Sequence, residues 1–238
     1  GVLTNDMESV INDPNIQVAV ELMGGIHPAR EVMLRLLEAG KDIVTANKAL
    51  LCEHGDEIFE CARRHGRTVC FEAAVAGGIP IIAAVGQSMA ANQILGIQAI
   101  LNGTTNYILT EMLLRGQSYE EALQGAQDLG YAEADPTLDV NGTDAAQKLG
   151  ILAQLSFGCK VKATDFHVSG IDKLERTDIQ YAKELGYTIK LLARVRLVNG
   201  QLELSVRPTL VRQDKPLAQI HGPFNAILLD GDVVGTVW

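Results

Sequence analysis

Hydrophobic positions in the first third of the chain follow two alternating patterns. Short apolar runs at 16–23, 42–46 and 67–75 predict three strands, the first of them buried. Apolar positions three or four residues apart predict helices over 27–39 and 48–65, between these strands. Strands that alternate with helices in this way predict right-handed crossovers and a parallel sheet. Ligands of such a sheet bind beyond the carboxyl ends of its strands.

The pattern changes at Pro80 and predicts a different kind of domain after it. We expect a helix over 81–91, a strand over 93–101 and a helix that begins within 102–106. Two further helices should begin at capping boxes and end at glycines. The boxes are Ser118 with Glu121 and Thr177 with Gln180, and the terminal glycines are Gly130 and Gly186.

Two turn dipeptides, Asn199-Gly200 and Asp230-Gly231, each separate two apolar runs and therefore predict antiparallel hairpins. The predicted fold class is α/β plus α+β. A partial Rossmann-like parallel sheet at 1–79 is followed by an α+β domain at 80–238. The paired runs of the hairpins are 187–198 with 201–211 and 226–229 with 233–238.

Acidic residues and a lysine concentrate in the segment 130–148, ahead of an apolar helix. Asp144 and Lys148 stand four residues apart on one helical face, so the carboxylate can hold the ammonium. Asn141 is expected to cap the helix, with Asp144 near its third position. A solvated turn with an ordinary ion pair, worth only about 0.3 kcal/mol, is the alternative. We prefer a functional site because the apolar residues after Lys148 predict a buried helix that carries this lysine toward the interior.

The composition indicates a small-molecule ligand. A formal charge of −9 argues against nucleic-acid or anionic-membrane partners, because both need concentrated Lys and Arg. The sequence has neither an apolar run of membrane-spanning length nor a signal-peptide pattern, so we expect a cytoplasmic protein. Cys52, Cys61, Cys70 and Cys159 form no CxxC pair, which favours structural thiols over a zinc or redox site.

Residues that follow the three predicted strands are the first candidates for ligand binding. Gly24 and Gly25 permit close approach of a ligand to the backbone, and Lys48 reaches the rim of the same crevice. Tight turns are the alternative role of the glycines.

The chain resembles homoserine dehydrogenases over nearly its whole length. Five segments in family-like order and spacing carry the resemblance: 21–29, 44–50, 71–80, 101–107 and 130–148. The resemblance implies hydride transfer between NAD or NADP and the pair aspartate 4-semialdehyde and homoserine, in threonine and methionine biosynthesis. It also implies that 80–238 is the substrate-binding and dimerisation domain of a homodimer.

The same resemblance implies roles for individual residues. Lys148 would donate a proton to the carbonyl oxygen, with Asp144 orienting it and Lys48 reaching both substrate and nicotinamide. Glu133 and Asp139 would bind the amino group of the substrate. Further pocket residues would be Tyr131 and Thr104, and the cofactor crevice would include Gly24, Gly25, Asn47 and Lys48. A monovalent cation, sodium, would be held by Glu72 and the carbonyl groups of Val75, Gly77 and Ile79.

Physical chemistry supports these roles independently. Reduction of an aldehyde develops alkoxide charge, which a desolvated lysine can stabilise and protonate. Whether Lys148 donates directly, or through water with Lys48, stays open. An α-ammonium group needs carboxylates such as Glu133 and Asp139. We place the dimer contacts on the apolar strand residues Ile94, Ile97 and Ile100, with ordinary core as the alternative.

The resemblance fails at both ends of the sequence. The sequence has no GxGxxG phosphate loop and starts at Gly1 without Met, and it also lacks the glycine-rich segment that the family has shortly after Trp238. We therefore expect a chain trimmed at both ends that binds cofactor weakly or not at all. Two other functions are alternatives. A buried lysine among carboxylates also fits a lyase that forms a Schiff base through Lys148 or Lys48, and the missing phosphate loop fits a non-catalytic assembly or binding module.

Overall fold

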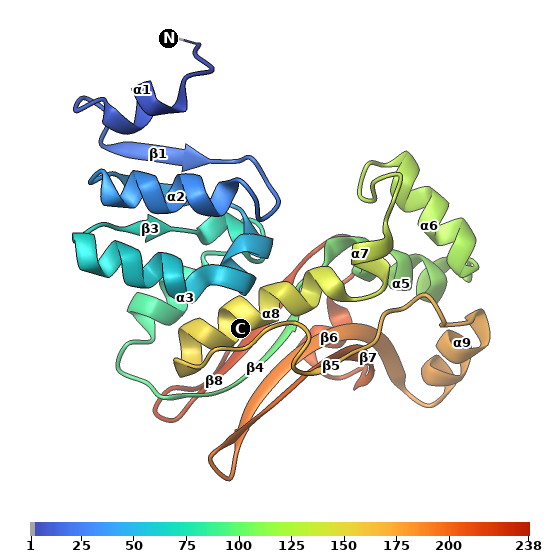
Figure 1. Ribbon diagram of the computed structural model, residues 1–238. Helices are drawn as coiled ribbons and strands as arrows, with labels where there is room; N and C mark the ends of the chain where they lie inside the picture. The colour runs from blue at the N-terminus through green and yellow to red at the C-terminus, as the bar shows by residue number, and fades with distance from the viewer. Residues whose placement is uncertain (1–2) are drawn as a thin grey trace. The chain divides into compact units, whose positions relative to one another are not determined.

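The computed structural model describes residues 3–238, and contacts divide the chain into two compact units, Gly1–Gly78 and Ile79–Trp238 (Figure 1). Gly1 and Val2, with which the first expected domain begins, lie outside the described residues. Each unit has its own sheet, as the alternating and antiparallel patterns predict. The predicted fold class is confirmed.

The first unit is a small parallel α/β layer. Its sheet has the order β1-β2-β3, and both pairs of neighbouring strands are parallel. Helices α2 and α3 pack against each other, and Met33, Leu37, Ile43, Leu50 and Ile58 are buried in this unit. The elements are α1 (Met7–Asn12), β1 (Val18–Glu21), α2 (Ala29–Glu38), β2 (Asp42–Thr45), α3 (Lys48–His65), β3 (Val69–Cys70) and the 3-10 turn η1 (Glu72–Ala74).

Two of the strand predictions were too long. Strand β1 lies at the edge of the described sheet, and its Val18 and Val20 side chains are 53% and 64% exposed, so the prediction of a buried strand was wrong. Strand β3 covers only two residues, because the chain turns into η1 at Glu72. Apolar runs alone do not distinguish a strand from an adjoining turn.

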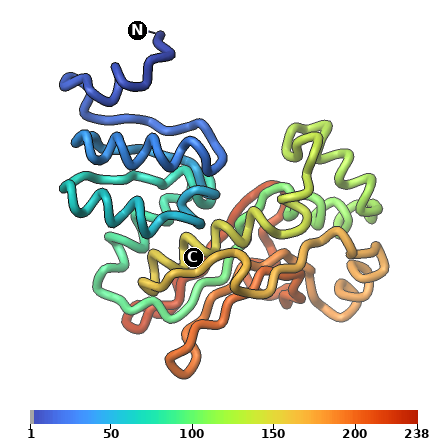
Figure 2. The backbone as a smooth tube through the Cα atoms, viewed as in Figure 1, coloured from blue at the N-terminus to red at the C-terminus, as the bar shows by residue number. Residues whose placement is uncertain are grey.

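The second unit is an α+β domain around a six-stranded sheet of order β5-β7-β6-β4-β8-β9. Helices α5, α8 and α9 pack against β6, while α6 packs on α5 (Figure 2). Ile97, Ala99, Ala193 and Val195 of the sheet are buried, as are Leu149 and Leu152 of α8. The helices are α4 (Ile81–Ala83), α5 (Gly103–Arg115), α6 (Tyr119–Asp128), α7 (Thr137–Val140), α8 (Thr143–Phe157) and α9 (Arg176–Glu184), with a π-turn η2 (Ala84–Ser88) and a 3-10 turn η3 (Pro216–Gln219). The strands are β4 (Ile94–Ile100), β5 (His167–Val168), β6 (Tyr187–Val198), β7 (Gln201–Arg212), β8 (Ala226–Gly231) and β9 (Gly235–Val237).

Both predicted hairpins are present, β6 with β7 and β8 with β9, but only one of the two predicted turns is correct. Asn199 and Gly200 join β6 to β7 with φ of 50° and 77°, as a two-residue hairpin with both central residues at positive φ requires. Asp230-Gly231 is not a turn, because both residues belong to β8 and the chain reverses just after them. A Cβ on Gly231 would lie 3.0 Å from Asn92 Oδ1, so this glycine permits close packing instead.

Of the two predicted capping boxes, one is correct and one is wrong. The capping box of Ser118 with Glu121 is present at α6, but the box at α9 is formed by Glu175 and Asp178, so the prediction of Thr177 with Gln180 was wrong. The helix predicted over 81–91 is broken into α4 and the π-turn η2.

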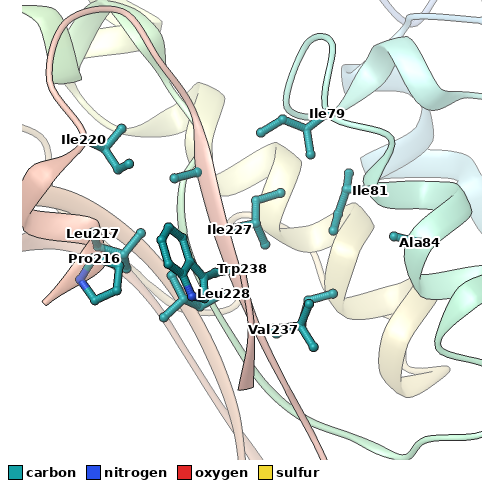
Figure 3. A pocket seen from close by; sticks show the side chains of 12 residues that line it. Ile79, Ile81, Ala84, Pro216, Leu217, Ile220, Ile227, Leu228, Val237 and Trp238 are labelled. Carbon is teal, nitrogen blue, oxygen red and sulfur yellow. The ribbon is translucent and has the colours of Figure 1, made fainter. Parts of the chain in front are cut away.

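The apolar strand residues chosen as dimer contacts are core. Ile94, Ile97 and Ile100 are buried within this chain, so that prediction was wrong. An apolar hollow lies beside β8, lined by segments 79–84, 216–220 and 226–238 (Figure 3). Among the residues described, there is no helix with the length and apolar character needed to cross a membrane.

Candidate functional site

A polar cleft of about 410 Å³ opens in the second unit. It combines the start of α5, the loop after α6, α7, the first turns of α8 and one residue of a later loop. The segments lie far apart in the sequence and meet only through the fold. Its lining residues are Asn102, Gly103, Thr104, Gly130, Tyr131, Glu133, Asp139, Asp144, Lys148 and Pro223.

Asn102 connects the polar groups of this cleft. Its side-chain oxygen accepts a hydrogen bond from the Thr105 backbone N–H at 2.8 Å and so caps α5. Because that oxygen is occupied, the Nδ2 group faces the carboxylates and donates to Asp139 Oδ1 at 2.7 Å and Asp144 Oδ2 at 3.0 Å. One buried amide thus orients two acidic side chains. The sequence predicted Asn102 only as part of a helix start, and no nearby sequence pattern indicated its hydrogen bonds to Asp139 and Asp144.

Lys148 is held at two points beside these carboxylates. Its Nζ donates to Asp144 Oδ2 at 2.7 Å and to the Leu101 carbonyl oxygen at 2.9 Å. The lysine side chain is 17% exposed and the partner carboxylate is buried, so the pair lies at the wall of the cleft. A charge-assisted hydrogen bond with this degree of burial fixes the position of the ammonium group.

The start of α8 differs from the prediction. Gly142, with φ of 88°, is the residue before the helix, and Asp144 occupies the second helical position. Asn141 instead accepts a hydrogen bond from the Thr143 backbone N–H at 2.9 Å, in a turn that precedes the helix. A Cβ at residue 142 would lie 3.2 Å from Val168 Cγ1, and its positive φ also favours glycine. The spacing of Asp144 and Lys148 still brings them together.

The remaining expected substrate residues line the same cleft. Thr104 Oγ1 donates to the Tyr131 carbonyl oxygen at 2.6 Å, which ties the loop after α6 to α5. The Tyr131 ring lies 5.1 Å from that of Tyr107, centroid to centroid. Glu133 is exposed, and its backbone carbonyl accepts a hydrogen bond from Gln127. The cleft therefore offers one exposed and two inner carboxylates.

Burial changes the acidity of one of them. Desolvation raises the pKa of Asp139, and the neighbouring negative charge of Asp144 raises it further. The hydrogen bond from Asn102 and the charge of Lys148 act in the opposite direction. A cation bound beside Asp139 would stabilise the negative charge of this carboxylate and so offset the effect of its burial.

The expected cofactor residues lie in the first unit, at the carboxyl ends of β1 and β2. Gly24 and Gly25 have φ of 72° and 69°, and a Cβ at either would meet nothing within 4 Å. Asn47 caps α3 at Leu50 N and donates from Nδ2 to the Gly25 carbonyl oxygen at 2.7 Å. Lys48 is the first residue of α3.

A buried carboxylate, which the sequence did not single out, supports this arrangement. Glu21 accepts hydrogen bonds from Thr45 Oγ1 at 2.6 Å and from the Met23 backbone N–H at 2.8 Å. It thereby joins the end of β1 to the end of β2 and fixes the start of the glycine loop. The residue was visible in the sequence only as the end of a predicted strand.

The expected sodium ligands follow β3 closely. Glu72 begins η1, and the backbone then turns through Ala76 and Gly77, whose φ values are 60° and 59°. Among the described residues, three or more His, Cys, Asp or Glu side chains do not gather into a metal-binding group. A site built from one carboxylate and carbonyl oxygens is of a different type.

Comparisons with known proteins show which family the chain resembles. A family model described as homoserine dehydrogenase matches residues 80–238, and one described as the NAD-binding domain of homoserine dehydrogenase matches residues 1–72. The homoserine dehydrogenase of Synechocystis sp. is 50% identical over 240 residues, covering 99% of this chain and 55% of the relative. That of Pseudomonas aeruginosa is 48% identical over 234 residues, covering 98% and 54%.

Solved structures show the same likeness. A homoserine dehydrogenase from Thiobacillus denitrificans superposes with a TM-score of 0.95 at 46% identity, covering 98% of this chain and 54% of that one. A hyperthermophilic archaeal homoserine dehydrogenase in complex with NADPH gives a TM-score of 0.83 at 26% identity, covering 100% and 69%. This chain spans about half the length of the curated relatives named above. With family models matching both of its units, the chain belongs to the homoserine dehydrogenase family.

Proposed function

We propose that this chain serves the interconversion of L-aspartate 4-semialdehyde and L-homoserine with NAD or NADP. The observation that carries the proposal is the connected set Asn102, Asp139, Asp144 and Lys148, which opens on a cleft in a member of this family. An amino-acid aldehyde has an ammonium group and a reacting carbonyl oxygen. The cleft offers carboxylates for the first and a fixed ammonium for the second.

Lys148 is proposed to move the proton. In the reducing direction, negative charge develops on the aldehyde oxygen, and the Lys148 ammonium stabilises that charge and gives a proton to it. In the oxidising direction the same amine takes the hydroxyl proton. Asp144 Oδ2 and the Leu101 carbonyl hold the Nζ atom, so the donor does not need to be reoriented during the reaction.

Asp139 and Glu133 are proposed to bind the substrate ammonium, with Thr104 and Tyr131 shaping the adjacent wall. The side-chain amide of Asn102 donates one hydrogen bond to Asp139 and one to Asp144. It is proposed to hold the two carboxylates in place for their separate roles, Asp139 for the substrate ammonium and Asp144 for Lys148.

The first unit is proposed to bind the nicotinamide dinucleotide. Beyond the carboxyl ends of β1 and β2, space for a ligand lies next to the Gly24 and Gly25 backbone. Gly24, Gly25, Asn47 and Lys48 would hold the cofactor. The bound nicotinamide supplies or accepts the hydride. The matched NAD-binding domain and the archaeal relative solved with NADPH support this part of the proposal.

Three further properties are proposed with it. Sodium would be bound by Glu72 and the carbonyl groups of Val75, Gly77 and Ile79. The protein would act in the cytoplasm as a homodimer. Because the isoleucines of β4 are buried, the exposed Leu210 of β7 is a better candidate for the dimer contact. The measured mass in solution, compared with that of a Leu210→Glu variant, tests this assignment.

The decisive test is an assay of homoserine oxidation by the native protein, followed as reduced nicotinamide absorbance with NAD and with NADP separately. We expect turnover with at least one cofactor and none with homoserine omitted. Absence of turnover with both cofactors, in a folded preparation, would refute the proposal. The family comparisons give no support to the Schiff-base lyase or the non-catalytic module. Borohydride trapping of a substrate adduct on Lys148 would revive the lyase.

A further inference from the structure

A second lysine of the same unit is more deeply buried than Lys148 and has no part in the proposed proton transfer. Lys190 lies on β6 and is 1% exposed. Its Nζ donates to Asn106 Oδ1 at 2.9 Å and to the Ile220 carbonyl oxygen. Burying an ammonium group lowers the stability of the folded protein unless the group is paired or hydrogen-bonded. Its contacts therefore indicate a specific task.

Asn106 connects Lys190 to the loop 220–224. Since the lysine is a pure donor, the Asn106 amide must turn its oxygen toward Nζ and its Nδ2 group the other way. The Nδ2 atom lies 3.1, 2.8 and 3.2 Å from the carbonyl oxygens of Ile220, Gly222 and Phe224. The two N–H groups of this one side chain, one of them shared between two carbonyl oxygens, thus hold the backbone of the loop 220–224 to α5.

Thr110 adds a contact from the next turn of α5. Its Oγ1 accepts a hydrogen bond from the Gly222 backbone N–H at 3.0 Å and donates to the Asn106 carbonyl oxygen at 2.6 Å. Asn106 and Thr110 are both buried. The loop is therefore fixed by hydrogen bonds in both directions, carbonyl oxygens to Asn106 and an amide to Thr110.

The loop held in this way is part of the cleft. Pro223 lines the cleft, and a Cβ on Gly103 would lie only 2.6 Å from the Pro223 carbonyl oxygen. The loop backbone thus packs directly on the first residue of α5, next to Asn102. A shift of the loop would change both the Pro223 wall and the turn that carries Asn102.

We propose that Lys190, Asn106 and Thr110 are positioning residues, which clamp the loop 220–224 onto α5 and so set the shape of the cleft for the amino-acid substrate. The substrate named here rests on the proposed function, whereas the clamp itself rests on the contacts above. The proposal predicts that loosening the clamp weakens substrate binding more than it slows the chemical step.

The test uses Thr110, because its hydroxyl can be removed or kept with little change in shape. Thr110→Val should accelerate hydrogen exchange of the peptide that contains Gly222 and raise the KM for homoserine about ten-fold, with smaller changes in kcat and in the cofactor KM. Thr110→Ser retains the hydroxyl and should restore both values. Lys190→Met should act in the same direction as Thr110→Val if it folds.

Ser118→Ala is the matched control, since it also removes a hydroxyl bonded to a backbone N–H, at the capping box of α6. It should leave the exchange of the loop and the homoserine KM unchanged. Unchanged loop exchange in folded Thr110→Val would overturn the proposal, as would faster exchange with an unchanged homoserine KM. If the wild type does not oxidise homoserine, the proposed function fails separately, and exchange at Gly222 alone decides the clamp.

Discussion

The surroundings of Lys148 and of Lys190 differ, although Lys148 bonds to Leu101 just before α5 and Lys190 to Asn106 in its first turn. Lys148 bonds to a carboxylate, that of Asp144, and lies beside a cleft. The two acceptors described for Lys190 are neutral oxygens, and burial lowers the pKa of its ammonium to about 8. Burial, and then the positive charge of Lys190, also lower the pKa of the nearby His221.

The difference indicates a division of labour. An ammonium that faces a cleft with a carboxylate partner can exchange protons with a ligand. Lys190 does not line the cleft, and its buried ammonium instead holds an amide and a carbonyl in place. The two lysines should therefore respond differently to the same substitution, one mainly in kcat and the other mainly in substrate affinity and stability.

The largest expected effect is that of Lys148→Met. Loss of a general acid and base should lower kcat for homoserine oxidation by about 10²- to 10⁴-fold, while the protein stays folded. Lys183→Met, which removes an exposed lysine of α9, is the control and should retain wild-type kcat. Steady-state assays and circular dichroism measure the two properties. A comparable fall in kcat for Lys190→Met would break the contrast between the two lysines.

The next effect is a pH dependence of stability that belongs to Lys190. Its pKa is about 8 in the folded protein and near 10.5 in the unfolded chain, so the unfolded state binds more protons between these values. Wild-type stability relative to Lys190→Met should therefore increase as the pH rises from 8 to 10.5, by about 3 kcal/mol in all. Urea unfolding of both proteins across this range measures it. A difference that does not vary with pH would show that the ammonium is not strained by burial.

A smaller effect is expected at the carboxylate side of the cleft. Because the pKa of Asp139 is raised, acidification removes its negative charge earlier than that of an ordinary aspartate. The homoserine KM should therefore rise as the pH falls through this raised pKa. In Asp139→Asn the KM should be about ten-fold higher at neutral pH and its acid dependence weaker. KM profiles of both proteins decide this, and identical acid limbs would contradict the assignment.

Local signals in the sequence were sufficient where both partners are near in the chain. Helix α3 starts and ends where expected, because Asn47 caps it and Gly66 ends it with φ of 61°. The pairing of Asp144 with Lys148 follows from helical spacing alone. Asn199-Gly200 likewise sets its own hairpin, since the turn requires positive φ at both residues.

Contacts between distant residues were not predictable. Lys190 was hidden in an apolar run, and its partners are 84 and 30 residues away in the sequence. Asn102 was recognised as a helix start, but its carboxylate partners come 37 and 42 residues later. The dipeptide Asp230-Gly231 is typical of a turn, and nothing in the sequence indicates that Gly231 instead packs against Asn92. The residues that line the cleft were therefore easier to predict from the sequence than the residues that hold them in position.

A third buried lysine gives the smallest effect and tests whether the role of Lys190 depends on its location. Lys41, in the first unit, donates to the carbonyl oxygens of Asp13 and Ile16 at 2.7 and 2.8 Å. Lys41→Met should lower stability by about 1 kcal/mol through these lost hydrogen bonds, because water can reach the freed carbonyls. Its homoserine KM should equal that of the wild type, unlike Lys190→Met, since the segment it holds does not line the cleft. Thermal unfolding and the homoserine KM measure the two effects. If Lys41→Met raised this KM as much as Lys190→Met, the effect would come from general loosening of the fold and not from the loop at Pro223.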